Sequence, residues 1–403
     1  MAMSSWKLAS ANVKVSHKAS AITISFTEEE LASYDLEGRL LGIYEFGANV
    51  RRGLDNSFQK RWREDAIPAR DLKQAALSRD ESWELTERYR ELTQKLLSDH
   101  GAARQWPETK VILERITGHT YQRLEESAAR FRAVYGHIPI LPPDQYRSLV
   151  VQATDGCPYN KCTFCTLYRD KEYMVRSPEQ FSAHIKEVLN FMGAGLSYRN
   201  AIFLGDANAL AISIGRLTGL LEILRSTREI RPLLDKGGVN AFLDIYTGIR
   251  KSVEDYRALG ALGLKRVALG VESGSEALLD FVEKPGKRDD IMWLVDTLKA
   301  AGLEVIVIFM VGLGGHTYRR DHLEDSATLV KQLALSKGDI IYLSQFAPST
   351  EAPYLRVAKA AHVKPLSHDE IVDETMAWKA RLAQELGGEG VKVVPYSFQR
   401  FIY

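Results

Sequence analysis

The chain is predicted to be an α/β protein, a partial (β/α)6 TIM-type barrel with an N-terminal α+β appendage and a C-terminal helical and strand extension. Between about residues 146 and 350, six short apolar runs are each followed by an amphipathic segment of helix length, which is typical of parallel β/α units. A complete eight-unit barrel needs about 250 residues, so six units in this span indicate an open barrel. The predicted strands are Leu149–Ala153, Ala201–Leu204, Phe242–Tyr246, Arg266–Val271, Val305–Val311 and Ile340–Gln345.

Clustered prolines separate this region from the N-terminal part. Pro139, Pro142 and Pro143 break regular structure and stiffen the path, so domains are expected at 1–143, 144–353 and 354–403. Residues 10–50 alternate apolar and polar, which predicts a small antiparallel sheet, and helices follow at 81–97 and 108–135. We expect this first domain to select the substrate as a lid.

The C-terminal extension is expected to contain one helix and one strand. The helix runs from Ser367, a favourable N-cap, to Leu386, because Gly387 and Gly388 end it. The strand covers 391–394.

Composition limits the partners. The chain has 53 Lys and Arg against 52 Asp and Glu, so bulk charge does not indicate nucleic acid, a membrane surface or an acidic ligand. No apolar run approaches the ~18 residues that cross a bilayer, and the N-terminus lacks an apolar signal core. We therefore expect a cytoplasmic protein without membrane association, in a compartment that keeps thiols reduced.

All three cysteines of the chain, Cys157, Cys162 and Cys165, lie within nine residues. Three thiolates on one loop suit a 4Fe-4S cluster whose fourth iron has no protein ligand. A structural zinc site wants a fourth Cys or a His nearby, and no His lies between Arg147 and Phe181. A disulfide would leave one cysteine over. A zinc-stabilised binding module stays open as an alternative.

This segment resembles the radical SAM superfamily, whose usual spacing is C-x3-C-x2-C with an aromatic residue before the last cysteine. Phe164 fills the aromatic position. The first gap holds four residues instead of three, which resembles a C-x4-C-x2-C branch related to oxygen-independent coproporphyrinogen dehydrogenases. The resemblance implies a partial barrel, a 4Fe-4S cluster, S-adenosylmethionine (SAM), and an external electron donor such as flavodoxin or ferredoxin.

Polar residues follow the predicted strands, where β/α barrels carry their sites. By resemblance, Asp206 or Asn208 receives the SAM amino group, and Glu272 and Ser273 meet its ribose and methionyl parts. Two-residue alternation at the end of the third strand puts Asp244, Tyr246 and Arg250 on one face, and Arg250 is the candidate for a bidentate pair with the SAM carboxylate. Helix capping by Asp206 and Asn208, and a salt bridge at the barrel rim for Arg250, are the structural alternatives. The full set of expected cofactor-binding residues is Phe164, Gly205, Asp206, Asn208, Arg250, Glu272, Ser273 and Gly312.

The resemblance implies reductive cleavage of SAM to a 5′-deoxyadenosyl radical, which abstracts hydrogen from a substrate. No cysteine is left for an auxiliary cluster or for a thiol that donates hydrogen. If a protein side chain quenches the substrate radical, it has to be a tyrosine, and Tyr246 and Tyr342 are the expected catalytic residues. A small molecule or natural-product intermediate is the expected substrate. An RNA substrate, suggested by the basic stretch Arg51–Arg63, and an iron-sulfur electron carrier that does not use SAM remain as alternatives.

Overall fold

The computed structural model describes residues 13–63, 72–98, 107–388, 390–396 and 401–403. The chain divides into two compact units, one formed by 1–138, 186–200 and 400–403 and the other by 139–185 and 201–399. The division after residue 138 lies close to the predicted boundary at 143. Residues 354–399 belong to the second unit and do not form a unit of their own.

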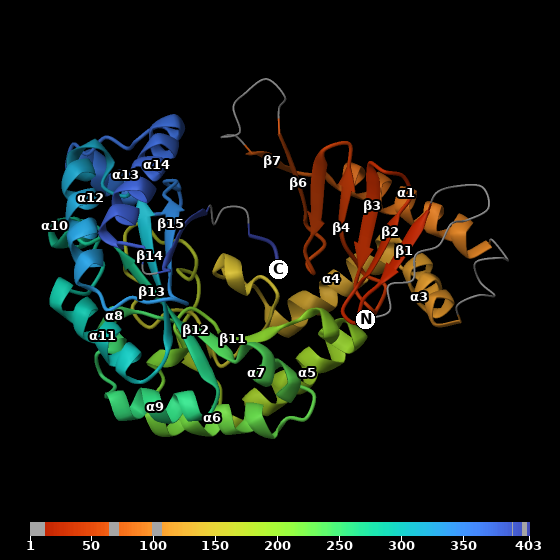
Figure 1. Cartoon of the computed structure of the whole chain (residues 1–403), viewed down its shortest axis with the longest axis horizontal. Helices are drawn as coiled ribbons and strands as arrows, with labels where there is room; N and C mark the ends of the chain where they lie inside the picture. Colours follow the sequence, from red (N-terminus) through yellow and green to blue (C-terminus); the bar gives the residue numbers. More distant parts are fainter. Residues whose placement is uncertain (1–12, 64–71, 99–106, 389, 397–400) are drawn as a thin grey trace. The chain divides into compact units, whose positions relative to one another are not determined.

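The first unit contains a seven-stranded antiparallel sheet in sequential order (Figure 1). Its strands are β1 (Lys14–His17), β2 (Ile22–Ser25), β3 (Glu30–Tyr34), β4 (Leu40–Glu45), β5 (Ala48–Arg52), β6 (Phe58–Arg63) and β7 (Leu72–Ala76). Its helices are α1 (Arg79–Ser98), α3 (Pro107–Gly118) and α4 (Tyr121–Tyr135). Period-two alternation puts Ile22, Ile24 and Ile43 on one face of the sheet, where they pack with Tyr89 of α1 and Ile116 of α3.

The predicted helix over 108–135 is wrong in one respect, because two helices occupy this span. Thr120 caps the second of them, its side chain accepting a hydrogen bond from the Arg123 backbone N–H at 3.3 Å. Amphipathic periodicity continues through 118–120, so the pattern of apolar residues did not reveal the break.

The second unit contains a seven-stranded parallel sheet in the order β16-β15-β14-β13-β12-β11-β8. The strands are β8 (Ser148–Gln152), β11 (Ala201–Gly205), β12 (Val239–Leu243), β13 (Leu264–Glu272), β14 (Glu304–Val311), β15 (Ile340–Gln345) and β16 (Lys392–Tyr396). Each neighbouring pair is parallel. The fold is therefore the expected partial TIM-type barrel, and the predicted C-terminal strand is its seventh strand.

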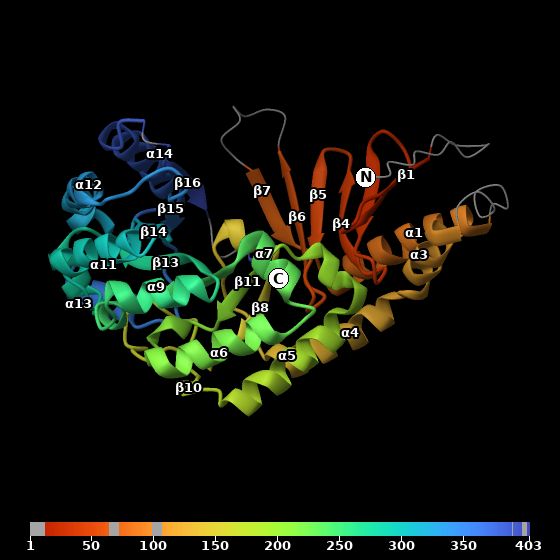
Figure 2. The same ribbon diagram turned by 60° about the horizontal axis from the view of Figure 1, so that its bottom comes forward.

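Helices follow the strands and lie on the outside of this sheet, as Figures 1 and 2 show for α6, α9, α11 and α12. The helical segments of this part of the chain are η1 (Pro143–Gln145), α5 (Pro178–Met192), η2 (Gly193–Tyr198), η3 (Ala209–Ala211), α6 (Ile214–Ser226), α7 (Arg231–Gly237), α8 (Ile245–Gly248), α9 (Val253–Ala261), α10 (Glu276–Phe281), α11 (Arg288–Ala300), α12 (Gly315–Gln332), α13 (Tyr354–Ala360) and α14 (His368–Glu385). The predicted last helix is confirmed as α14, with Ser367 and Glu370 forming a capping box. Two short strands, β9 (Thr154–Asp155) and β10 (Met174–Val175), form an antiparallel pair.

The predicted third strand, Phe242–Tyr246, is displaced by three residues. The strand is β12, and Asp244 after it caps α8, accepting from the Thr247 backbone N–H at 2.6 Å. Asn240 interrupts the apolar run at the start of β12, and this polar residue hid the true strand. The expectation that Asp244, Tyr246 and Arg250 share one strand face is therefore wrong.

Candidate functional site

A pocket of about 200 Å³ lies at the C-terminal ends of the barrel strands. Its wall combines the cysteine loop with residues on or just after β11 to β16. The lining residues are Ile140, Cys157, Cys162, Phe164, Cys165, Thr166, Leu167, Tyr168, Ala207, Asn208, Phe242, Leu243, Asp244, Gly270, Glu272, Lys284, Ile308, Met310, Ser344 and Tyr396. The position agrees with the general rule that β/α barrels carry their sites at this end.

The cysteine loop is closed by its own polar groups. Asn160 has φ +49°, a left-handed conformation that asparagine tolerates better than most residues. Its side chain donates to the Tyr168 carbonyl at 2.6 Å, and its backbone N–H lies 3.4 Å from the sulfur of Cys157. The four-residue gap between the first two cysteines therefore fits a turn at Asn160, and all three cysteines still line one pocket.

The thiols sit in a poorly solvated environment. Burial raises the pKa of Cys162 to about 12 and also raises that of Cys165, so binding to a metal has to supply the free energy of deprotonation. Among the described residues, no three His, Cys, Asp or Glu side chains converge as ligands of one ion. A 4Fe-4S cluster does not require such convergence, because each thiolate binds a different iron.

The loop is held against the segment after α10. The Tyr159 hydroxyl donates to the Glu283 carbonyl at 2.8 Å, and the Thr163 backbone N–H donates to the Val282 carbonyl at 3.0 Å. Lys284 follows directly, and its side chain lines the same pocket as the cysteines. Arg169, four residues after the last cysteine, donates to the carbonyls of Cys165 and Cys162 at 2.7 and 2.6 Å.

Lys284 forms an ion pair with Glu272 at the end of β13. The ammonium nitrogen and the carboxylate oxygen are 3.5 Å apart, with side chains 12% and 10% exposed. Burial raises the pKa of Glu272, and Lys284 opposes this shift. Glu272 has φ +64° at a register shift of β13 against β14, a sparsely populated conformation that concentrates at functional sites.

Two polar residues after β11 have different environments. Asp206 contacts the ammonium of Lys171 at 3.3 Å and the hydroxyl of Tyr168 at 3.4 Å, and burial raises its pKa to about 6. Asp206 does not line the pocket, whereas Asn208 does. The Asn208 amide donates to Asp244 and to Thr247, and its oxygen is buried without a hydrogen-bond partner.

Two predicted site residues, Tyr246 and Arg250, lie outside the pocket lining. Tyr246 is on α8 and 45% exposed, and the guanidinium of Arg250 stacks on its ring at 4.5 Å. Arg250 is itself exposed. Both positions follow from the strand's true end at Leu243, because the chain turns into a helix on the surface at Asp244.

Four other predicted residues also lie outside the lining. Ser273 is buried, with its hydroxyl 2.8 Å from His322 Nδ1, and the other ring nitrogen of His322 is 3.0 Å from the Met310 carbonyl. Gly312, with φ +88°, packs close to Ile371 of α14. Gly205 ends β11, and its carbonyl accepts from the Ala153 N–H at 2.8 Å.

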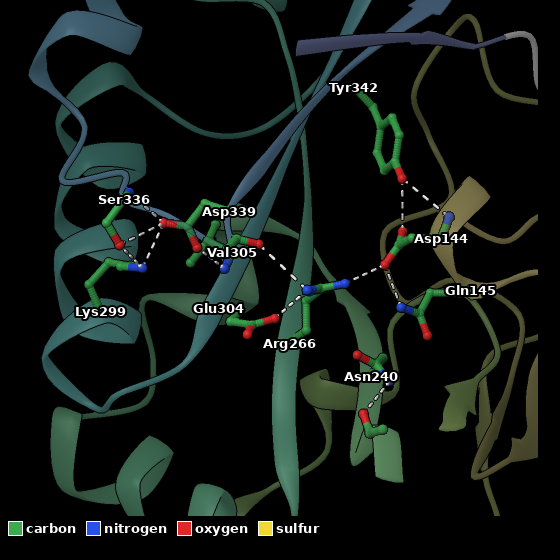
Figure 3. Close-up of polar contacts among 12 residues, drawn as sticks. Asp144, Gln145, Asn240, Arg266, Lys299, Glu304, Val305, Ser336, Asp339 and Tyr342 are labelled. Carbon is green, nitrogen blue, oxygen red and sulfur yellow. Dashed lines mark hydrogen bonds and ion pairs between the residues drawn. The ribbon is translucent and has the colours of Figure 1, made fainter. Parts of the chain in front are cut away.

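Tyr342 is the fourth, and it belongs to a polar network at the other end of the barrel (Figure 3). Its hydroxyl donates to the Asp144 carboxylate at 3.0 Å and accepts from the Asp144 N–H at 3.2 Å. Arg266 pairs with Asp144 at 2.5 Å and also with Glu304. These groups come from η1 and from the beginnings of β13 and β14, so they close the N-terminal end of the barrel.

Comparison with known proteins identifies the barrel. The family model described as "Radical SAM superfamily" matches residues 151–330, which include all three cysteines and the strands from β11 to β14. Residues 151–330 belong to the radical SAM superfamily. Enzymes with this domain use a 4Fe-4S cluster and SAM, and the matched segment of this chain holds all three cysteines.

Solved radical SAM structures are more distant. Coproporphyrinogen III oxidase from Escherichia coli is 17% identical, with 64% of this chain and 56% of that chain covered and a TM-score of 0.44. A radical SAM methyltransferase from Sphaerobacter thermophilus is 13% identical, with 64% of this chain and 68% of that chain covered and a TM-score of 0.44. Methylornithine synthase is 15% identical, with 69% of this chain and 78% of that chain covered and a TM-score of 0.41. No curated protein matches the chain. The match spans little more than half of the coproporphyrinogen III oxidase, and at this similarity the reactions of these proteins carry no argument about its substrate.

The pocket of the radical SAM domain fits both cofactors. Three thiols line one side, which is the ligand number of a cluster with one open iron. The unpartnered oxygen of Asn208 is a buried acceptor aimed at no protein group, as expected where a ligand supplies the donor. A Cβ at Gly270 would lie 2.7 Å from the Glu272 carboxylate, so glycine here keeps room for the charged groups.

Sequence reasoning missed Lys284 and Tyr396. Lys284 stands in the turn Glu283-Lys284-Pro285-Gly286, which shows no chemical signature and is distant in sequence from the cysteines. Tyr396 had a usable signal, because period-two alternation along β16 puts it on the same face as Val394. Val394 and Tyr396 both pack against the cluster of lumen side chains that contains Ile306, Ile308 and Tyr342. In the described part of the chain, no helix is long and apolar enough to cross a membrane.

Proposed function

We propose that the chain reductively cleaves SAM at a single 4Fe-4S cluster held by Cys157, Cys162 and Cys165, and that it acts on a small-molecule substrate. The carrying observation is that all three thiols line one pocket with polar groups from several strand ends. The bound cofactors supply a 5′-deoxyadenosyl radical able to take hydrogen from an unactivated C–H bond. An external one-electron donor, such as flavodoxin or ferredoxin, delivers the electron.

The chain's own residues bind and orient the nucleotide. We retain the roles proposed for Phe164, Asn208 and Glu272, since each of them lines the pocket. The Asn208 oxygen is free to accept a hydrogen bond from SAM. The proposed role of the Glu272 carboxylate is to accept a hydrogen bond from a ribose hydroxyl of SAM. Apolar side chains such as Phe242, Ile308 and Met310 exclude water from the remaining wall.

We also assign Tyr396, in place of Tyr246 and Tyr342, as the tyrosine that faces a substrate radical. Tyr396 lines the pocket, and its ring lies 5.3 Å from the ring of Tyr342. Burial raises the pKa of Tyr396, so its O–H bond is intact at neutral pH. Donation of that hydrogen atom forms a C–H bond and leaves a phenoxyl radical, which one electron from the external donor and one proton return to tyrosine.

The test is anaerobic reconstitution followed by reduction with dithionite. Wild-type protein is expected to contain four irons and four sulfides per chain, to change its EPR spectrum when SAM is added, and to release 5′-deoxyadenosine and methionine. Cys157→Ala should abolish both the cluster and the release. A full cluster whose EPR spectrum does not change when SAM is added would indicate an electron carrier instead. Metal analysis that finds one zinc and no iron per chain would indicate a zinc-stabilised binding module.

A further inference from the structure

The pocket contains a buried charge pair beside the cysteines whose function goes beyond holding SAM. Lys284 and Glu272 both line the pocket with Cys157, Cys162 and Cys165, and each side chain is about nine-tenths buried. Burying two charges rarely adds stability compared with apolar packing of the same volume. A buried pair in contact with a redox site instead acts on the charge of that site.

The backbone holds Lys284 firmly in this place. Its N–H donates to the Leu279 carbonyl at 2.9 Å at the end of α10, after Glu283 in a left-handed conformation with φ +54°. The cysteine loop bonds to the two preceding carbonyls, those of Val282 and Glu283. Hydrogen bonds therefore hold the backbone of Lys284 beside the cysteine loop, and the ion pair with Glu272 holds its ammonium group.

Room for the pair is provided by Gly270. A Cβ at this position would lie 2.7 Å from the Glu272 carboxylate and 3.5 Å from the Lys284 ammonium. A contact under 3 Å to a carboxylate held by its partner would displace the pair. The lumen face of β13 thus carries a glycine where the two head groups meet.

Lys284 is the member of the pair that is held against the cysteine loop, because the loop hydrogen-bonds to the carbonyls of Val282 and Glu283 just before it. Glu272 lies on β13, and its carboxylate partly compensates the charge of the ammonium group. Because the site is poorly solvated, water and salt screen this charge less than they screen an exposed lysine.

We infer that Lys284 and Glu272 are positioning residues that set the reduction potential of the cluster, the ammonium group raising it and the carboxylate lowering it. This inference rests on the proposed cluster at the three cysteines. A reduced cluster carries one more negative charge than an oxidised one. A fixed cation nearby stabilises the reduced form and a fixed anion destabilises it.

The experiment is an EPR-monitored redox titration of the reconstituted full-length protein without SAM. Lys284→Met should lower the ratio of reduced to oxidised cluster at a fixed applied potential by about tenfold, which is 59 mV for a one-electron couple. Glu272→Gln should raise that ratio by roughly threefold, because its partner cation is left uncompensated. The double variant should lie between the two single variants.

Matched variants separate charge from structure. Lys287→Met removes an exposed lysine three residues further along and should leave the potential unchanged. Lys284→Arg keeps the charge and should titrate near wild type. The Lys284→Met shift should persist in high salt, since a buried charge is weakly screened. If Lys284→Met does not assemble a cluster, the sign of the Glu272→Gln shift decides.

Shifts of the same sign in both single variants, or an equal shift in Lys287→Met, would overturn the inference. The inference would also be overturned if the ratio of reduced to oxidised cluster in both single variants stayed within about twofold of the wild-type ratio. These outcomes are distinct from failure of the proposed function. If the proposed function fails, wild-type protein forms no cluster or does not cleave SAM. If only this inference fails, the cluster forms and cleaves SAM, but its reduction potential does not depend on Lys284 and Glu272.

Discussion

At the scale of single residues, the site depends on which of two neighbouring side chains faces the pocket. Asn208 faces it and Asp206 does not, although they are two positions apart. Asp206 is satisfied by Lys171 and Tyr168, while one oxygen of Asn208 has no partner. An unsatisfied buried acceptor is costly in a folded protein unless a ligand pairs with it. The free acceptor therefore marks the ligand side of this turn.

The same distinction applies to the tyrosines and gives a prediction. Tyr396→Phe removes the hydroxyl group of a tyrosine that lines the pocket and should reduce product formation at least tenfold, with a smaller effect on SAM cleavage, since cleavage does not need the phenol. The ratio of product to 5′-deoxyadenosine, measured by liquid chromatography once a substrate is in hand, reports this uncoupling.

Tyr246→Phe is the matched control, because Tyr246 is 45% exposed on α8. It should turn over like wild type. If the ratio of product to 5′-deoxyadenosine is the same in the Tyr396 variant and in wild type, Tyr396 does not take part in the reaction. A loss of coupling in Tyr246→Phe would instead support Tyr246, one of the two tyrosines predicted from the sequence.

At the scale of elements, the two ends of the barrel are built for different purposes. The C-terminal end gathers unpaired or strained polar groups around the pocket. The N-terminal end pairs its charges: Asp339 accepts from the Val305 N–H at 2.7 Å, the Ser336 N–H at 2.8 Å and the Lys299 ammonium at 2.6 Å (Figure 3). Satisfied charges stabilise an end that has no ligand to bind.

Arg266 tests the contribution of this closed end. Arg266→Met leaves the carboxylates of Asp144 and Glu304 without their shared partner and should lower the free energy of unfolding by about 2 kcal/mol, which is less than the ~3–5 kcal/mol lost when a fully buried pair is broken, because the side chain is 19% exposed. Urea denaturation followed by circular dichroism measures this loss.

Arg257→Met serves as the comparison, since Arg257 on α9 forms an exposed pair with Glu254 and an exposed hydrogen bond to the Ala300 carbonyl, and its effect should stay below about 1 kcal/mol. SAM binding should change little in either variant, because Arg266 lies at the end of the barrel away from the pocket. Equal stability of the Arg266 variant and wild type would show that the network contributes no net stabilisation.

At the scale of the whole molecule, the chain is two units with separate cores. The antiparallel sheet packs its own side chains against α1 and α3, and the barrel lumen forms another cluster around Ile306 and Ile308. Units with their own cores commonly unfold as separate cooperative transitions. All three cysteines belong to the barrel unit.

Calorimetry of cluster-loaded and chelator-treated protein should therefore show two transitions. A ligand that binds only the folded barrel stabilises only that unit, so one transition should rise by about 5 °C on loading while the other stays in place. A variant with all three cysteines replaced by alanine should show no rise. A single transition, or two that move together, would show that the units unfold as one.

The sequence by itself determined the class of this protein. Clustered cysteines with Phe164 need only local spacing to be read, and repeated apolar runs followed by amphipathic segments indicate a parallel barrel because period and length are local properties. Caps such as Ser367 are local as well, which is why α14 was predicted closely. The seventh strand was visible as an apolar run, but its place beside β15 was not.

Only the tertiary structure decided which residues share the pocket. Tyr159 and Glu283 are 124 positions apart, and nothing local in either segment shows that they meet and bring Lys284 to the cysteines. A three-residue error in β12 was enough to move Tyr246 and Arg250 from an expected strand face to the surface. The physical reason is that the direction of a side chain in a barrel depends on where its strand ends, and strand ends are set by packing between distant segments.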